Sequence, residues 1–86
     1  MKLPSVGDTV RVVFLDHVED GDEPIKFEVF GRVIKKDKTS INVGSWLYIQ
    51  DDNIIDDPNI KSWCIVNSTI QSISLLQTVE TYHRNS

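Results

Sequence analysis

The sequence predicts an all-β fold, and two features of its composition support this prediction. Val and Ile dominate the aliphatic residues, whereas Ala is absent. β-Branched side chains lose rotamer freedom in a helix, and Ala is the residue that favours a helix most. Short segments also alternate between apolar and polar residues, as half-buried strands do. The 86 residues leave room for one domain with one hydrophobic core.

The first strand is expected over residues 9–17, where apolar side chains recur at every second position. Val10, Val12 and Phe14 would share one face of this strand. Residues 16–24 are polar and contain a glycine and a proline, which is typical of a loop.

Residues 25–34 predict a second strand, in which apolar and charged side chains alternate. Gly31 interrupts this pattern and indicates a bulge or a sharp bend where two strands cross closely. Residues 35–38 are expected to form a tight, solvated turn, and residues 39–49 alternate again as a third strand. Two strands joined by four polar residues predict a hairpin.

The last two strands are expected over residues 62–66 and 70–76, with Leu75 directed toward the core. Residues 50–61 contain a proline and predict the longest irregular segment. Between the last strands, residues 67–69 predict a short turn or a single turn of 3₁₀ helix.

Five short strands, bends near the glycines and a brief turn before the last strand are typical of a small, strongly bent barrel. An SH3-like or Sm-like barrel fits this pattern best. An OB-fold is disfavoured, because its usual helix between strands is not predicted here. We expect residues 1–77 to form the single β-barrel domain and residues 78–86 to form a C-terminal tail.

Composition also restricts the compartment and the class of partner. A single cysteine cannot form an internal disulfide, and residues 1–5 lack the apolar stretch of a signal peptide. No apolar run approaches the roughly 18 residues of a membrane span. We therefore expect a cytoplasmic protein without a membrane partner. The net charge of −4 disfavours generic nucleic-acid binding, which needs basic surface to neutralise phosphates.

Acidic residues gather in two of the predicted loops. They indicate either a surface for a basic partner or solvated loops that keep a small protein soluble. A metal site is not expected, because the second loop lacks the glycine and glutamate that an EF-hand requires. The candidate acidic partner surface consists of Asp20, Asp22, Glu23, Asp51, Asp52, Asp56 and Asp57.

Basic and aromatic residues supply the candidate ligand-binding or partner-binding set. The basic residues surround the predicted hairpin turn, where they could bind phosphate groups or, as we favour, protect a sheet edge from unwanted pairing. The aromatic residues could form a stacking platform for a base, anchor a protein partner or cover a second core. The set comprises Arg32, Lys35, Lys36, Lys38, Trp46, Tyr48 and Trp63.

No group of residues predicts catalysis. A cysteine nucleophile needs a nearby base, and no known template brings His17 to Cys64. Cys64 alternates with Trp63 in an apolar strand, which predicts a buried, inert thiol. No glycine-rich phosphate loop is present. We expect a protein that is not an enzyme and that uses no cofactor or metal.

Three segments resemble small proteins of tailed bacteriophages. They are residues 10–17 (VRVVFLDH), 29–34 (VFGRVI) and 65–76 (IVNSTIQSISLL). That group shares a hydrophobic strand ending in Asp, a hairpin strand containing Gly, and an Ile-rich last strand after a turn. A proline commonly precedes this turn in the group, and Val66 and Asn67 stand there instead.

The resemblance implies a phage accessory protein that acts in the cytoplasm of the bacterial host. Many phage proteins of this size counteract a host defence, by sequestering a nucleotide signal or by occluding a defence protein. Our leading hypothesis is such a binding protein, forming homo-oligomers through exposed strand edges. The alternatives are an Sm-like barrel that binds RNA or DNA and a minor structural component of the virion.

Overall fold

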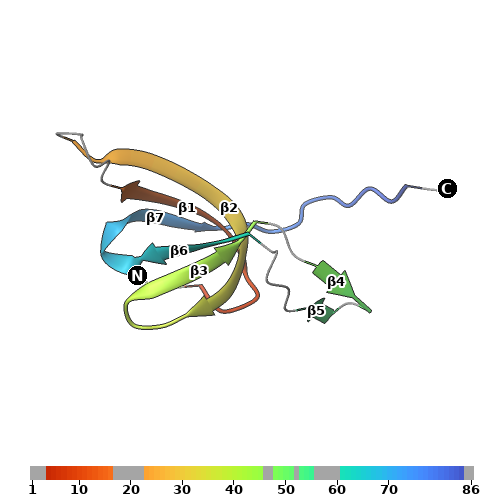
Figure 1. Ribbon diagram of the computed structural model, residues 1–86. Coiled ribbons are helices and arrows are strands. Elements are labelled where there is room, and N and C mark those ends of the chain that lie inside the picture. The colour runs from red at the N-terminus through yellow and green to blue at the C-terminus, as the bar shows by residue number, and fades with distance from the viewer. Residues whose placement is uncertain (1–3, 17–22, 46–47, 52, 56–60, 85–86) are drawn as a thin grey trace.

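The fold is all-β, as the composition predicts. The structure, a computed structural model, describes residues 4–16, 23–45, 48–51, 53–55 and 61–84. Within these residues the regular elements are strands and one short 3₁₀ helix, η1 (Figure 1). Their bounds are β1 Thr9–Asp16, β2 Ile25–Lys36, β3 Ser40–Gly44, β4 Tyr48–Gln50, β5 Asn53–Ile55, β6 Ser62–Val66, η1 Asn67–Thr69 and β7 Ile70–Leu75.

Five strands form one antiparallel sheet in the order β6-β3-β2-β1-β7, and β4 pairs with β5 in a separate two-stranded sheet. The five-stranded sheet is not closed, because no pairing joins its edge strands β6 and β7 within the described residues. The expected barrel is therefore not established. The predicted single turn of 3₁₀ helix is confirmed as η1, which links these two edge strands.

β2 connects the two halves of the sheet by bending between them (Figure 1). Its first half pairs with β1, and its second half pairs with β3. A Cβ atom built on Gly31 would lie 2.4 Å from the carbonyl oxygen of Gly44, so only glycine permits this approach. The close crossing predicted at Gly31 is confirmed, whereas the register shift lies farther along, between Val33 and Lys35.

The core lies between the two halves of the bent sheet. Six buried side chains form it, and all six are Val or Ile, which suit a pleated sheet surface. No buried polar or charged side chain is found among the described residues. The core residues are Val10, Val12, Val33, Ile41, Val43 and Ile65.

The third strand predicted over residues 39–49 is wrong in its extent. β3 ends at Gly44, and β4 begins at Tyr48. β4 pairs with β5, which lies inside the segment predicted to be irregular. Alternation of apolar and polar residues alone cannot distinguish one long strand from two short ones. The strand is interrupted at Gly44, where the backbone crosses close to Gly31. At the β4–β5 turn, Asp51 adopts a left-handed backbone with φ of 51°.

Three smaller predictions also need correction. The turn predicted over residues 35–38 begins later, because β2 continues to Lys36. Leu75 pairs with the buried Val10 but is 61% exposed, since it lies on an edge strand. Cys64 is exposed rather than buried, because β6 is the other edge strand of the sheet.

The chain beyond β7 leaves the sheet as an extended, exposed segment (Figure 1). The backbone N–H of Leu76 donates to the carbonyl oxygen of Thr9 at 2.9 Å, and residues 77–84 follow without regular structure. Among the described residues, the structure contains no helix with the length and apolar character needed to cross a membrane.

Candidate functional site

An open groove lies next to the core, on the inner face of the bent sheet. Phe14 pairs with Phe27 across β1 and β2, and Trp63 pairs with the buried Val43 across β6 and β3. Residues paired across antiparallel strands share a face, so these aromatic side chains continue the inner face. Phe14 is partly buried against the core, whereas Phe27 is 43% exposed and Trp63 is 52% exposed.

Two adjoining hollows make up this groove. The first has a volume of about 350 Å³ and the second about 340 Å³. Three aromatic side chains line both hollows, so we define the aromatic groove by Phe14, Phe27 and Trp63. The remaining lining residues are Asp16, Cys64 and Ile65 in the first hollow, and Glu28, Val29, Phe30 and Ser45 in the second.

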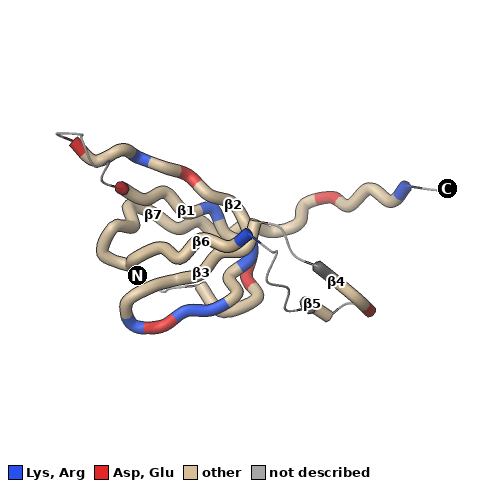
Figure 2. The backbone as a smooth tube through the Cα atoms, viewed as in Figure 1, with Lys and Arg blue, Asp and Glu red and all other residues tan. Residues whose placement is uncertain are grey.

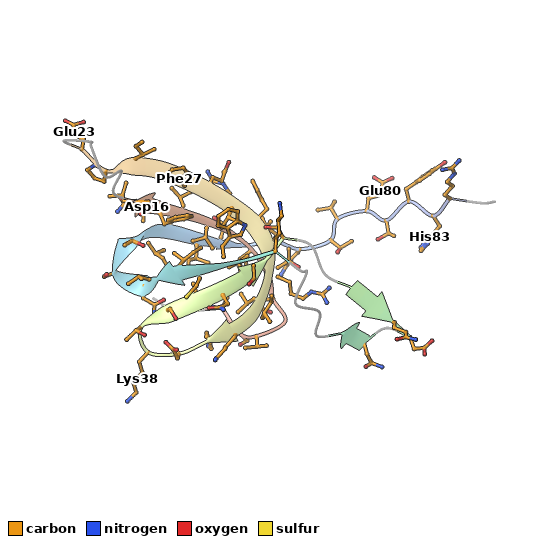
Figure 3. All side chains as sticks on the ribbon, in the orientation of Figure 1. Asp16, Glu23, Phe27, Lys38, Glu80 and His83 are labelled. Carbon is orange, nitrogen blue, oxygen red and sulfur yellow. The ribbon has the colours of Figure 1, made fainter. Side chains whose placement is uncertain are left out.

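One wall of the groove is fixed by aromatic stacking. The ring centroids of Phe14 and Phe27 lie 5.8 Å apart, with an interplanar angle of 25°. Such a pair contributes about 0.5–1.5 kcal/mol beyond the burial of its area. Phe27 projects from the arch of β2, and Asp16 lies at the end of β1 nearby (Figure 3). The wall is thus ordered without any ligand.

The first half of β2 presents unpaired backbone groups beside the groove. Hydrogen-bonded and non-bonded pairs alternate along an antiparallel ladder. The N–H of Val33 donates to the carbonyl of Asp8, so every second residue of β2 counted back from Val33 directs its backbone groups toward β1. The residues between them, Lys26, Glu28 and Phe30, direct their backbone groups away from β1. No strand of the described chain pairs with β2 on that side before Arg32.

β6 presents a second open edge on the opposite wall. The N–H of Asn67 donates to the carbonyl of Thr39, which continues the β3–β6 register. By the same alternation, the backbone groups of Ser62, Cys64 and Val66 point away from β3. The groove therefore lies between two strand edges whose outward backbone groups pair with no strand of the described residues.

The electrostatic character of the groove is acidic. Asp16 and Glu28 border it, and none of the described lining residues is Lys or Arg. Glu28 also accepts a hydrogen bond from Nε of Arg11 in an exposed ion pair. Figure 2 shows no charged residue along β3, β6 or β7. The groove is suited to apolar or cationic groups rather than to anions.

The predicted basic residues do not gather at this groove. Lys35 and Lys36 end β2, Lys38 lies in the turn that follows, and all three are exposed. β3 separates this half of β2 from β6 and Trp63. Arg32 is partly buried, and its Nε lacks a hydrogen-bond partner in the described structure.

The turn that carries Lys38 is organised by an acidic residue. Oδ1 of Asp37 accepts hydrogen bonds from the backbone N–H of Thr39 at 2.8 Å and of Ser40 at 2.9 Å. These two backbone bonds, with a further bond from the Thr39 hydroxyl, lower the pKa of Asp37 below its ordinary value of 3.8. These hydrogen bonds give Asp37 a structural role in holding the turn.

The other predicted residues are dispersed or not described. Glu23 is exposed just before β2, and Asp51 is exposed in the β4–β5 turn. Tyr48 begins β4, where it pairs with Ile55. Of the predicted residues that the structure describes, it brings only Trp63 into the groove. Trp46, Asp20, Asp22, Asp52, Asp56 and Asp57 lie outside the described residues.

Sequence reasoning missed Phe14 and Phe27 as site residues, because alternation assigns both to the inner face and hence to the core. One available signal was size: the inner positions of β1 change from Val10 and Val12 to a phenylalanine. Large aromatic side chains at the ends of paired strands can extend beyond the layer that covers the valines.

The groove supplies binding surface without a recognisable reactive centre. Cys64 is exposed on its β6 wall and is a single thiol. Within the described residues, no three His, Cys, Asp or Glu side chains come close enough to hold a metal ion. Aromatic side chains and open backbone edges are the groups that receive an extended polypeptide. Comparison with protein-family models, curated proteins and solved structures gave no match.

Proposed function

We propose that this protein is a non-enzymatic binding module whose aromatic groove receives an extended, apolar segment of a partner protein. The observation that carries this proposal is the continuation of the core face through the partly buried Phe14 to the exposed Phe27 and Trp63. Exposed aromatic side chains beside open strand edges offer both side-chain pockets and backbone hydrogen bonds. A partner strand could also complete the SH3-like or Sm-like barrel that the strand order suggests.

The charge of the groove favours a peptide over a nucleotide. A nucleotide signal would bring phosphate groups near Asp16 and Glu28, and no described lining residue is Lys or Arg. Lys35, Lys36 and Lys38 lie instead around the end of β2, and the exposed Lys26 and Lys61 line neither hollow. We therefore propose occlusion of a protein rather than sequestration of a nucleotide.

The biological role that fits both the groove and the resemblance is that of a phage accessory protein. In this proposal the protein acts in the bacterial host and occludes a segment of a defence protein. No specific observation favours the Sm-like nucleic-acid hypothesis or the virion hypothesis, so both stay predictions.

The test is a selection of peptides from a randomised library against the immobilised protein, followed by calorimetric titration of the selected peptides. Replacing Trp63 with Ala should weaken binding at least about thirtyfold, as expected for an interface hot spot. The matched control is Ile34→Ala, because Ile34 is exposed at 37% and lines neither hollow of the groove. Equal binding by the two variants would contradict the proposal.

A second experiment separates the alternative ligand classes. Melting temperatures measured with a panel of cyclic and ADP-ribose-like nucleotides should not shift, because linkage stabilises only a protein that binds its ligand. RNA or DNA binding should be absent, or weak and steeply dependent on salt. If a nucleotide shifts the melting temperature in a saturable way and Trp63→Ala abolishes this shift, the ligand of the groove is a nucleotide rather than a peptide.

A further inference from the structure

We infer that residues 77–84 of one copy occupy the aromatic groove of a second copy of this chain. The inference rests on the groove of the proposed function and assigns it one occupant, a self-derived strand. It is carried by the exposure of this segment, by its direction, and by the chemistry of the β6 edge.

Residues 77–84 expose large apolar side chains that the rest of the described chain does not cover. Val79 is 98% exposed and Tyr82 is 90% exposed. Among the described residues, the hydrogen bond from Leu76 to Thr9 is the last backbone link between this end of the chain and the sheet. This nearly complete exposure leaves both side chains accessible to a second copy.

The segment points away from the groove of its own copy. Asp16 and Phe27 lie on one side of the molecule, whereas Glu80 and His83 project from the other (Figure 3). The Cα radius of gyration is 14.9 Å, while a compact domain of this length has about 12 Å. A groove on another copy is therefore the accessible target.

The composition of the segment suits a strand. Thr78, Val79, Thr81 and Tyr82 favour extended structure, and residues 77–84 contain neither glycine nor proline. Eight extended residues span about 26 Å, which exceeds the length of the five-residue β6. The segment is long enough to pair along the whole of this edge.

Of the two edges beside the groove, that of β6 is the better acceptor. Its outward backbone groups belong to Ser62, Cys64 and Val66, none of which is charged. The β2 edge carries Lys26 and Glu28, which discourage strand addition. A strand added to β6 would lie about 4.8 Å from it, beside the aromatic side chains of the groove.

One cation of the segment is complementary to the groove. Arg84 follows the apolar residues of the segment, and Asp16 and Glu28 border the groove, whereas Glu80 lies between Val79 and Tyr82. Because the donated segment and the receiving groove are different surfaces, each copy can give one strand and accept another. Reciprocal exchange between two copies would give a two-fold dimer, and exchange along a series of copies would give closed rings or open chains.

The test uses sedimentation velocity of the full chain across a series of concentrations. The wild-type protein should self-associate. The double substitution Val79→Ser with Tyr82→Ser should weaken self-association at least about thirtyfold, and Trp63→Ala should do the same. Circular dichroism melting of each variant verifies that the sheet is retained.

Mixing the two variants gives the discriminating result. The tail variant keeps an intact groove and the Trp63→Ala variant keeps an intact segment, so the mixture should form a one-to-one complex. Val6→Ser is the matched control, because Val6 is 57% exposed but lies outside both surfaces. A wild-type protein that stays monomeric, or a mixture that forms no complex, would overturn the inference.

The tail variant also separates this inference from the proposed function. If the tail variant binds library-selected peptides while the wild type stays monomeric, only the self-association inference fails. If copies associate through the groove but no foreign peptide binds the tail variant, the proposed capture of a partner protein fails instead.

Discussion

The inner face of the bent sheet has two ends that share one alternation pattern but differ in their cover. At the sealed end, Val10, Val12, Val33 and Val43 are at most 1% exposed. At the open end, Phe27 and Trp63 expose about half of their area on the same face. The difference teaches that alternation specifies which face a side chain joins, whereas the extent of the opposing strands decides whether it is covered.

The largest effect is expected from a substitution at the sealed end. Replacing the 2% exposed Ile41 with Ala removes buried methyl groups and leaves a cavity. The free energy of unfolding should fall by about 3 kcal/mol, as for other large-to-small core changes. Urea denaturation followed by circular dichroism measures this loss. A decrease in the free energy of unfolding of less than about 1 kcal/mol would show that side chains at the sealed end are no more buried than those at the open end.

A somewhat smaller loss is expected at the bend that joins the two ends. In Gly31→Ala the new Cβ would meet the backbone oxygen of Gly44, which cannot rotate away. Overpacking of this kind costs about 1–3 kcal/mol. Chemical denaturation should show this loss for Gly31→Ala. Gly7→Ala is a comparison with a different cause of loss: no atom lies within 4 Å of its new Cβ, but Gly7 has φ of 98°, so its penalty comes from backbone strain alone.

At the open end, stability and binding should separate. Trp63→Ala removes a side chain that is already half exposed, so the free energy of unfolding should fall by only about 1 kcal/mol. Peptide binding should nevertheless be lost. Parallel denaturation and calorimetric titration of this variant measure both quantities. A loss of stability as large as that of Ile41→Ala would place Trp63 in the core instead.

These expectations also mark how far sequence reasoning reaches. The all-β class, the η1 turn, the inward valines and the close approach at Gly31 follow from local pattern and backbone sterics. Local pattern does not reveal where opposing strands stop, so Phe14 and Phe27 could not be separated from the core. The same limit joined β3 to β4 in the prediction, because their alternation is in phase across Ser45.

The smallest effect is expected far from both ends, at Asp37. Its folded-state pKa is lowered mainly by backbone hydrogen bonds from Thr39 and Ser40, so its contribution to stability is present above pH 3.8. This contribution is lost as the pH falls through the depressed folded-state pKa. The stability gap between wild type and Asp37→Ala should therefore narrow from about pH 7 to about pH 2. Glu23→Ala, which removes an exposed carboxylate outside the groove and outside residues 77–84, is the matched control.

The pairing of β1 with β7 has a consequence for the order of events during synthesis. β1 lies between β2 and β7, yet residues 17–69 separate it from β7 in the chain. A ribosome must therefore synthesise the chain as far as β7 before the β1–β7 ladder can form. Until then, the backbone groups of β1 that will pair with β7 have no strand partner in the nascent β1–β2 hairpin. Chains that end before Ile70 should therefore depend on chaperones or be degraded.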